Sequence, residues 1–117
     1  MKTQAPASTI VLMGATGDLT KRKLIPALYK MLVDGYLLNY VIIGTGREHS
    51  SKETIFSAAQ QFVQHRDAAL WQQLIDRFQY QRVDFYTSDD YTNLKTCIEQ
   101  QEAAYNLPGN RLFFLAT

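Results

Sequence analysis

Several features are scarce in this chain of 117 residues, and each scarcity narrows the class of protein. A single cysteine, Cys97, cannot form an internal disulfide, which favours a reducing, cytoplasmic compartment. No apolar run approaches the ~20 residues that cross a bilayer, and residues 1–8 lack the hydrophobic core of a secretory signal. The formal net charge of +1 gives no electrostatic reason to expect a nucleic acid or a membrane surface as a partner.

The residue sets of metal centres and of serine hydrolases are scarce as well. His49 and His65 are the two histidines, and no cluster of cysteine and histidine accompanies them, so we expect no metal site. No G-x-S-x-G elbow occurs. Hydrophobic residues, in contrast, make up 46% of the chain, enough for one domain with a real core. We expect a flexible lead-in over residues 1–8 and that single domain over residues 9–117.

Strand and helix patterns alternate along the domain. Apolar runs predict strands at residues 9–14, 40–45, 80–85 and 111–116. Helical spacing of apolar residues predicts helices near residues 18–33, 50–63, 70–78 and 89–105. Such alternation is typical of an α/β fold, with a parallel Rossmann-type sheet and helices on both faces. The doubly wound order of four strands is 3-2-1-4, which predicts a ligand crevice between the first and fourth strands.

The run from Thr9 to Leu19 ends a strand in a turn framed by two glycines. Gly14 and Gly17 lack a Cβ, so the chain can turn sharply and a ligand can approach the backbone closely. A helix that begins there directs free N–H groups and its positive dipole end at the space above the turn, which suits a phosphate. We therefore predict that this turn binds the pyrophosphate of a dinucleotide, with Thr16 adding a hydroxyl. Spacing alone also permits a tight connection without a ligand, and Asp18 as a helix cap.

Local signals predict where the helices begin, bend and end. Pro26 cannot lie deep in a helix without removing a backbone hydrogen bond. We therefore expect a short helical turn over residues 18–23 and a kink or restart near Pro26. Asp34-Gly35 is expected to end this helix. Ser50 and Glu53 have the spacing of a capping box at the start of the next helix.

Arg47 follows the second predicted strand, at the place where a dinucleotide fold carries the residue that selects the cofactor. An acid at that place holds the ribose 2′-hydroxyl of NAD, whereas an arginine accommodates the 2′-phosphate of NADP. Arg47 therefore favours NADP, unless it is a solvated loop arginine. Its neighbour Glu48 could pair with Arg47 or let the site accept NAD, so both cofactors stay open at this point.

Asp84-Phe85 and the basic run Lys21-Arg22-Lys23 are further candidates. Asp84-Phe85 ends the third predicted strand, where an acid commonly faces the adenine side of the crevice; a capping or turn role is the alternative. The basic run directly follows the glycine turn. Such a run is usually a solvated helix face, but one member could point at anionic groups in the crevice. Composition does not choose among the three.

Three segments resemble one known family, in order along the chain. The stretch G-A-T-G-D-L-T-K-R-K-L-I-P at 14–26 resembles the opening motif of glucose-6-phosphate dehydrogenase, G-A/G-S/T-G-D-L-A-K-R/K-K-x-x-P. I-G-T-G-R at 43–47 is similar to the family's V-G-x-A-R segment, and G-N-R-L-F-F-L-A at 109–116 is similar to its N-R-L-F-Y-L-A strand. The long motif with its lysines is far more specific than two glycines.

The resemblance implies the N-terminal NADP-binding Rossmann domain of an oxidoreductase of the pentose phosphate pathway. The family oxidises glucose 6-phosphate at C1 to 6-phosphogluconolactone and passes the hydride to the nicotinamide. Lys23 matches the family lysine that lies near substrate and nicotinamide, and Glu48 stands where serine or glutamine is commoner. The implied cofactor contacts are the pyrophosphate at Gly14, Ala15, Thr16, Gly17, Asp18 and Leu19, the 2′-phosphate at Arg47, and the adenine at Asp84 and Phe85.

Length separates this chain from the family's complete enzymes, which are several times longer. Their R-I-D-H-Y-L-G-K-E stretch with the catalytic histidine does not occur here, so the resemblance implies a truncated part that is inactive alone. One alternative is a standalone, non-catalytic dinucleotide-binding module. Another is a sugar-nucleotide epimerase-like protein, which expects a third glycine where Thr20 stands. The apolar edge at 112–116 predicts self-association.

Overall fold

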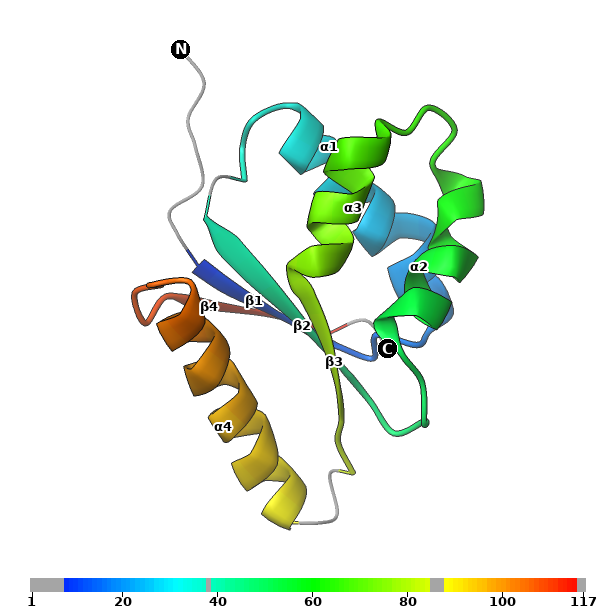
Figure 1. Ribbon diagram of the computed structural model, residues 1–117. Helices are drawn as coiled ribbons and strands as arrows, with labels where there is room; N and C mark the ends of the chain where they lie inside the picture. Colours follow the sequence, from blue (N-terminus) through cyan, green and yellow to red (C-terminus); the bar gives the residue numbers. More distant parts are fainter. Residues whose placement is uncertain (1–7, 38, 85–87, 116–117) are drawn as a thin grey trace.

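A parallel sheet lies between two layers of helices in the computed structural model, which describes residues 8–37, 39–84 and 88–115 (Figure 1). The strands pair in the order β3-β2-β1-β4, and all pairs are parallel. This confirms the α/β, Rossmann-type class and the predicted order. The strands are β1 (Ser8–Met13), β2 (Tyr40–Gly46), β3 (Phe78–Arg82) and β4 (Arg111–Leu115).

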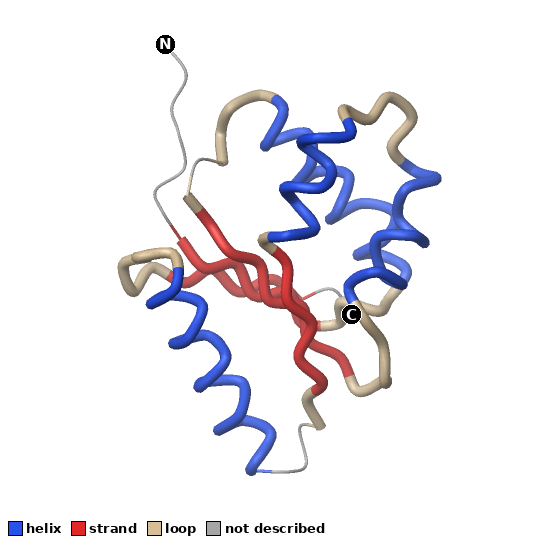
Figure 2. Tube along the Cα trace, viewed as in Figure 1, coloured by secondary structure: helices blue, strands red, loops and turns tan. Residues whose placement is uncertain are grey.

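The helices are divided unequally between the two faces of the sheet, as Figure 2 shows. One face carries α1 (Ile25–Val33), α2 (Lys52–Ala59), the 3-10 turn η2 (Gln60–Phe62) and α3 (Ala68–Asp76), and the other carries α4 (Ser88–Ala104). Successive side chains of a strand point to opposite faces. In β1, Ile10 and Leu12 therefore pack under α1, α2 and α3, whereas Val11 packs under α4.

The layer that contains α1, α2 and α3 holds the larger core. Trp71 meets Tyr29 and Phe56 edge to face, each with ring centroids 5.4 Å apart, and Phe56 meets Phe78 at 5.1 Å. The core under α4 is smaller and consists of Val11, Ile43, Val83, Leu94 and Ile98.

The helix after β1 runs from Asp18 to Val33 but changes its winding on the way. Residues Thr20–Leu24 form a π turn, in which the Ile25 N–H donates to the Thr20 carbonyl, and Pro26 lies in the first turn of α1. A proline ring clashes with the carbonyl four residues before it, and the wider turn relieves this clash. The expected kink near Pro26 is therefore a π turn that leads directly into α1.

The other helix ends follow the predictions in part. Gly35, at φ +83°, ends α1 as expected. The capping box is wrong by one residue, because Ser51 rather than Ser50 caps α2 and accepts the Thr54 N–H at 3.2 Å. The helix predicted over 50–63 stops at Ala59 and continues only as the 3-10 turn.

Strand β3 begins and ends earlier than the pattern at 80–85 predicts. Phe78 pairs with Ile42 and is fully buried, so it anchors the strand, which ends at Arg82. Asp84 therefore follows the strand instead of ending it. Phe85, Ala116 and the lead-in up to Ala7 lie outside the described residues.

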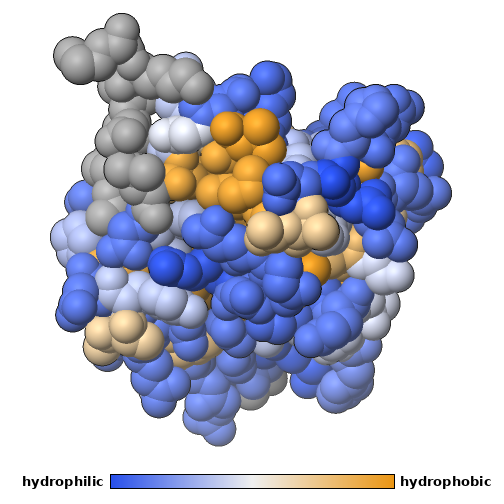
Figure 3. Space-filling model, turned by 45° about the horizontal axis from the view of Figure 1, so that its top comes forward, coloured by the Kyte–Doolittle hydropathy of each residue, from blue (hydrophilic) through white to orange (hydrophobic). Residues whose placement is uncertain are grey.

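The surface is mainly hydrophilic in the view of Figure 3, with one larger apolar area and a few smaller ones. Large apolar side chains that are exposed in the described chain include Met31 and Val33 on α1 and four consecutive residues of β4. Within the described ranges, no helix has the length and apolar character to cross a bilayer. The same part of the chain contains no group of three acidic, histidine or cysteine side chains placed to hold a metal ion.

Candidate functional site

The predicted crevice lies at the carboxyl ends of β1, β2 and β4. Met13, the last residue of β1, pairs with Thr45 on one side and with Leu115 on the other. The chain leaves β1 for α1 on one face and enters β4 from α4 on the opposite face. This is the switch point of a doubly wound sheet, where ligands of this fold class bind.

The turn after β1 is held by backbone hydrogen bonds before any ligand arrives. The N–H groups of Gly14 and Ala15 both donate to the Thr45 carbonyl, at 2.9 and 2.7 Å. Gly14 has φ +95°, which a residue with a Cβ rarely adopts. Its carbonyl accepts the Gly17 N–H at 3.0 Å and the Thr20 hydroxyl at 3.1 Å. The turn is therefore rigid, and its shape requires glycine at position 14.

Ala15 is buried beneath the turn, where it presses against β2. A Cβ built on Gly44 would lie 2.6 Å from the Ala15 Cβ and 2.6 Å from Phe78 Cζ. The turn and β2 thus approach more closely than any side chain at position 44 would permit. Ala15 is 1% exposed and its N–H is bonded to Thr45, so it supports the shape of the turn.

The helix that follows the turn begins at Asp18, so the amide groups of its first turn have no acceptor within the helix. They and the positive end of the helix dipole suit an anion above the turn. The Asp18 carboxylate does not cap this helix. It accepts the Arg22 Nε–H at 2.8 Å and lies 3.5 Å from Lys21 Nζ, and the bond from Arg22 lowers the pKa of Asp18. The capping alternative for Asp18 is therefore wrong.

The loop after β2 is hydrogen-bonded to the glycine turn and to β3. The Thr16 hydroxyl donates to Glu48 Oε2 at 2.7 Å, which joins this loop to the glycine turn. The Tyr80 hydroxyl donates to the Glu48 carbonyl at 2.6 Å, and Arg82 Nε donates to the Arg47 carbonyl at 2.8 Å. The hydrogen bond from Thr16 lowers the pKa of Glu48, so this carboxyl is ionised at neutral pH.

A pocket of about 310 Å³ lies beside this loop and is lined by Arg47, Glu48, Arg82 and Asp84. Two of these residues, Arg47 and Asp84, are sequence-predicted cofactor contacts that the fold brings together. Asp84 is half-buried, and its N–H donates to Asp90 Oδ2 at 2.6 Å, which ties it to the start of α4. The sequence analysis did not single out Arg82, although its place at the carboxyl end of β3 is a usable signal.

The remaining predicted residues lie along the turn and the first helix. Leu19 is exposed in the first helical turn, and Lys23 is exposed on the π turn. The sequence analysis assigned no role to Tyr80 or Thr20. The Tyr80 hydroxyl supports the loop after β2, and the Thr20 hydroxyl supports the glycine turn. Backbone amides, a hydroxyl and a guanidinium form a donor set that fits an anionic phosphate ligand, while the Glu48 carboxylate fits a ribose hydroxyl better.

The sheet order, the crevice at its switch point and the glycine turn define a dinucleotide-binding domain of the Rossmann type. The family model described as "Glucose-6-phosphate dehydrogenase, NAD binding domain" matches residues 11–117. The chain belongs to this family. The resemblance inferred from the three motifs is thereby confirmed.

Known relatives carry the same name. Glucose-6-phosphate 1-dehydrogenase of Chlamydia muridarum is 36% identical over 119 residues, covering 96% of this chain and 24% of that enzyme. The enzyme of Bacillus subtilis is 32% identical over 118 residues, covering 99% of this chain and 24% of its own length. The chain therefore spans about a quarter of the curated relatives that it matches. These relatives are oxidoreductases, and the chain corresponds to their N-terminal part.

Solved structures agree with this assignment. Glucose-6-phosphate dehydrogenase in complex with its substrate glucose-6-phosphate superposes with a TM-score of 0.86 at 32% identity, covering all of this chain and 26% of that one. The enzyme of Mycobacterium avium superposes with a TM-score of 0.78, covering 96% of this chain and 24% of that one. At 22% identity, this second likeness supports the fold alone.

Proposed function

We propose that this chain is the cofactor-binding part of an NADP-dependent dehydrogenase that oxidises glucose 6-phosphate to 6-phosphogluconolactone in the pentose phosphate pathway. One observation carries the proposal: the glycine turn after β1 and the Arg47 loop after β2 lie at neighbouring strand ends, joined by the 2.7 Å hydrogen bond from Thr16 to Glu48. A phosphate-binding turn and a cation for the 2′-phosphate are thus adjacent. Membership of the family supports the dehydrogenase chemistry.

Each predicted contact has a defined part in this proposal. The turn from Gly14 to Gly17 and the amides of Asp18 and Leu19 hold the pyrophosphate. Arg47 holds the 2′-phosphate through its planar fork of donors. Asp84 and Phe85 flank the adenine.

The nicotinamide side of the site is supplied only in part by this chain. Bound NADP would supply the acceptor for the hydride that leaves C1 of the sugar. Lys23 positions the sugar and the nicotinamide, whereas the proton of the C1 hydroxyl requires a general base that the R-I-D-H-Y stretch supplies in the family. Because that stretch is not in this sequence, we propose that the 117-residue chain alone does not turn over. A cytoplasmic location, which the lone cysteine favours, belongs to the same proposal.

Glu48 supports NAD as a second cofactor. Its ionised carboxylate accepts a hydrogen bond from the Thr16 hydroxyl beside the glycine turn, where a ribose 2′-hydroxyl could also donate to it. The same charge opposes a 2′-phosphate. NADP and NAD are therefore compared in one experiment.

Isothermal titration calorimetry of the chain with NADP and with NAD tests the cofactor assignment. We expect Arg47→Ala to weaken NADP binding roughly 10- to 100-fold, as loss of a charge-assisted bidentate contact does, and to change NAD binding less than threefold. Lys95→Ala is the control, because this exposed lysine lies on α4. Equal, weak binding of both dinucleotides by all three proteins would remove Arg47 from its role.

Turnover is tested by adding glucose 6-phosphate and NADP to the purified chain and following NADPH absorbance. We expect no sustained formation of NADPH, because the R-I-D-H-Y stretch that supplies the general base in the family does not occur in this sequence. Production of NADPH at rates typical of an enzyme would contradict the assignment.

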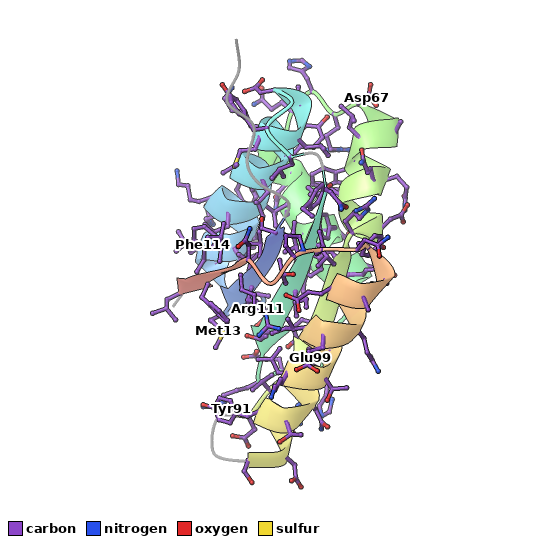
Figure 4. All side chains as sticks on the ribbon, turned by 90° about the vertical axis from the view of Figure 1, so that its left-hand side faces the viewer. Met13, Asp67, Tyr91, Glu99, Arg111 and Phe114 are labelled. Carbon is purple, nitrogen blue, oxygen red and sulfur yellow. The ribbon has the colours of Figure 1, made fainter. Side chains whose placement is uncertain are left out.

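The outer edge of β4 supports a proposal of self-association. Leu112, Phe113, Phe114 and Leu115 are 44 to 77% exposed, and β4 ends the sheet beside β1. Figure 4 shows Phe114 on this edge strand and Arg111 close to α4. An exposed apolar edge pairs readily with another chain. Light scattering coupled to size exclusion should show concentration-dependent dimers or larger species, and a monomer at every concentration would contradict this.

A further inference from the structure

Arg82 occupies a place in the sheet that brings its guanidinium to the cofactor-selecting loop. It is the last residue of β3 and pairs in register with Gly46, which directly precedes Arg47. Its Nε–H donates to the Arg47 carbonyl at 2.8 Å. An arginine has five N–H donors, so the four at Nη1 and Nη2 take no part in this bond. Arg82 is thus oriented by the same loop that carries Arg47.

The charges around the pocket indicate what Arg82 contributes to it. Arg47 and Arg82 contribute two cations to its lining, and Glu48 and Asp84 contribute two carboxylates. With Arg47 as the lone cation, a phosphate dianion entering this pocket would meet an excess of negative charge. Arg82 removes that excess. Binding of a phosphate beside Glu48 therefore requires a second cation, and the structure supplies it within the same pocket.

We propose that Arg82 is a second specificity-determining residue, which holds the ribose 2′-phosphate of NADP together with Arg47. The inference rests on the proposed function, because it takes this pocket as the place of the adenosine ribose. Arg82 acts on the 2′-phosphate alone and makes no contact that NAD would need. Its loss therefore changes the ratio of the two affinities rather than dinucleotide binding in general.

The pair of probes 2′,5′-ADP and 5′-AMP tests this directly, since the two differ only by the 2′-phosphate. Their dissociation constants are measured on the 117-residue chain and on its variants Arg82→Gln, Arg82→Lys and Arg47→Gln. Lys95→Gln serves as control, because it removes the same charge from an exposed site of α4. We expect Arg82→Gln to weaken 2′,5′-ADP about tenfold and to leave 5′-AMP within about twofold, as loss of one charge-assisted contact does. Arg82→Lys should recover part of the loss, since it keeps the charge without the fork.

Each other result has a definite meaning. Equal weakening of both probes by Arg82→Gln would show that Arg82 only supports the loop, and no weakening of either would remove it from the site; both overturn the proposal. If Arg47→Gln leaves 2′,5′-ADP unaffected while Arg82→Gln weakens it, the role of Arg47 falls and that of Arg82 stands. If the unmodified chain binds 2′,5′-ADP no more tightly than 5′-AMP, both assignments fall.

Discussion

The two faces of the sheet are held by different kinds of contact. On the α1–α3 face, an aromatic group around Trp71 and Phe56 packs against apolar strand residues, and the core there is continuous from β1 to β3. On the α4 face, the helix contributes mainly Leu94 and Ile98 to a small apolar cluster. Because burial of apolar surface is the main stabilising term, α4 is bound less firmly by its core.

Polar contacts at the end of α4 compensate for its small core. Glu102 accepts two hydrogen bonds from Arg111 of β4, at 2.8 and 2.9 Å. Asn39 Nδ2 donates to the Tyr105 carbonyl at 2.9 Å, and Arg77 lies 4.1 Å above the Tyr105 ring. These contacts gather at the amino ends of β2 and β4, opposite the crevice. The comparison teaches that the α1–α3 face is stabilised mainly by its apolar core, whereas the amino ends of β2 and β4 are stabilised by these polar contacts of α4.

Matched leucine truncations give the largest expected difference between the faces. Leu74 of α3 is 0% exposed and Leu94 of α4 is 7% exposed. We expect Leu74→Ala to lower the free energy of unfolding by about 3–4 kcal/mol and Leu94→Ala by about 2 kcal/mol, because the smaller cluster collapses more easily around the cavity. Urea titration followed by circular dichroism measures both. A larger loss for Leu94→Ala would invert the comparison.

A single added methyl group tests how tightly the α1–α3 face is packed at the site. Gly44→Ala places a Cβ 2.6 Å from both Ala15 and Phe78, so we expect a loss of about 2 kcal/mol in unfolding free energy. The matched control is Gly109→Ala near β4, where a Cβ would meet nothing within 4 Å. Its effect should stay within about 1 kcal/mol. Equal stabilities of the two variants in urea would show that β2 and the turn can move apart.

The ion pair between α4 and β4 gives the smallest expected effect, and a dependence on pH. Hydrogen bonds from Arg111 lower the pKa of Glu102 below its ordinary 4.5, so the folded chain binds fewer protons than the unfolded chain in mild acid. The stabilisation is therefore complete above pH 4.5 and is lost as the pH falls through the folded-state pKa. Glu102→Gln should cost about 1.5 kcal/mol at pH 7 and less as the pH falls below 4.5 towards pH 3.

Glu99→Gln is the control for that measurement, because Glu99 is half exposed and lies 3.9 Å from Lys95. It should change the unfolding free energy by less than about 0.5 kcal/mol at either pH. A cost of Glu102→Gln that is the same at pH 7 and pH 3 would show that the side chain acts through packing and not through its charge.

Much of the fold could be predicted because its signals are local. Apolar runs and helical spacing identified each strand, and the doubly wound class that their alternation indicates has the order 3-2-1-4. The bounds of β3 were not predicted, because Phe78 continues the helical spacing of residues 70–78. In the structure α3 ends at Asp76, and Phe78 packs against Phe56 as the first residue of β3. The π turn was equally hidden, because its cause is a steric clash at Pro26 that several windings could relieve.

The site was predictable where a backbone shape or a charge carries the signal. Gly14 was identified because it and Gly17 frame the turn after an apolar strand, and Arg47 because of its distance from these glycines. The bond from Thr16 to Glu48 spans 32 residues, and the contact of Arg82 with the Arg47 carbonyl spans 35. Neither has a sequence signature, because strand register alone determines which side chains meet at the end of a parallel sheet.

The π turn at Thr20–Leu24 places one residue more between the glycine turn and α1 than an α-helical turn would. An α-helix rotates by about 100° for each residue, so a deletion inside it would turn Ile25, Leu28 and Leu32 away from the sheet. A π turn contains one residue more than an α turn, but a deletion that restored α winding would bring back the clash between the Pro26 ring and the carbonyl four residues before it. The basic run Lys21-Arg22-Lys23 occupies this turn. The distance from the glycine turn to α1 is therefore set by Pro26, and a change in the length of this run would disturb the packing of α1.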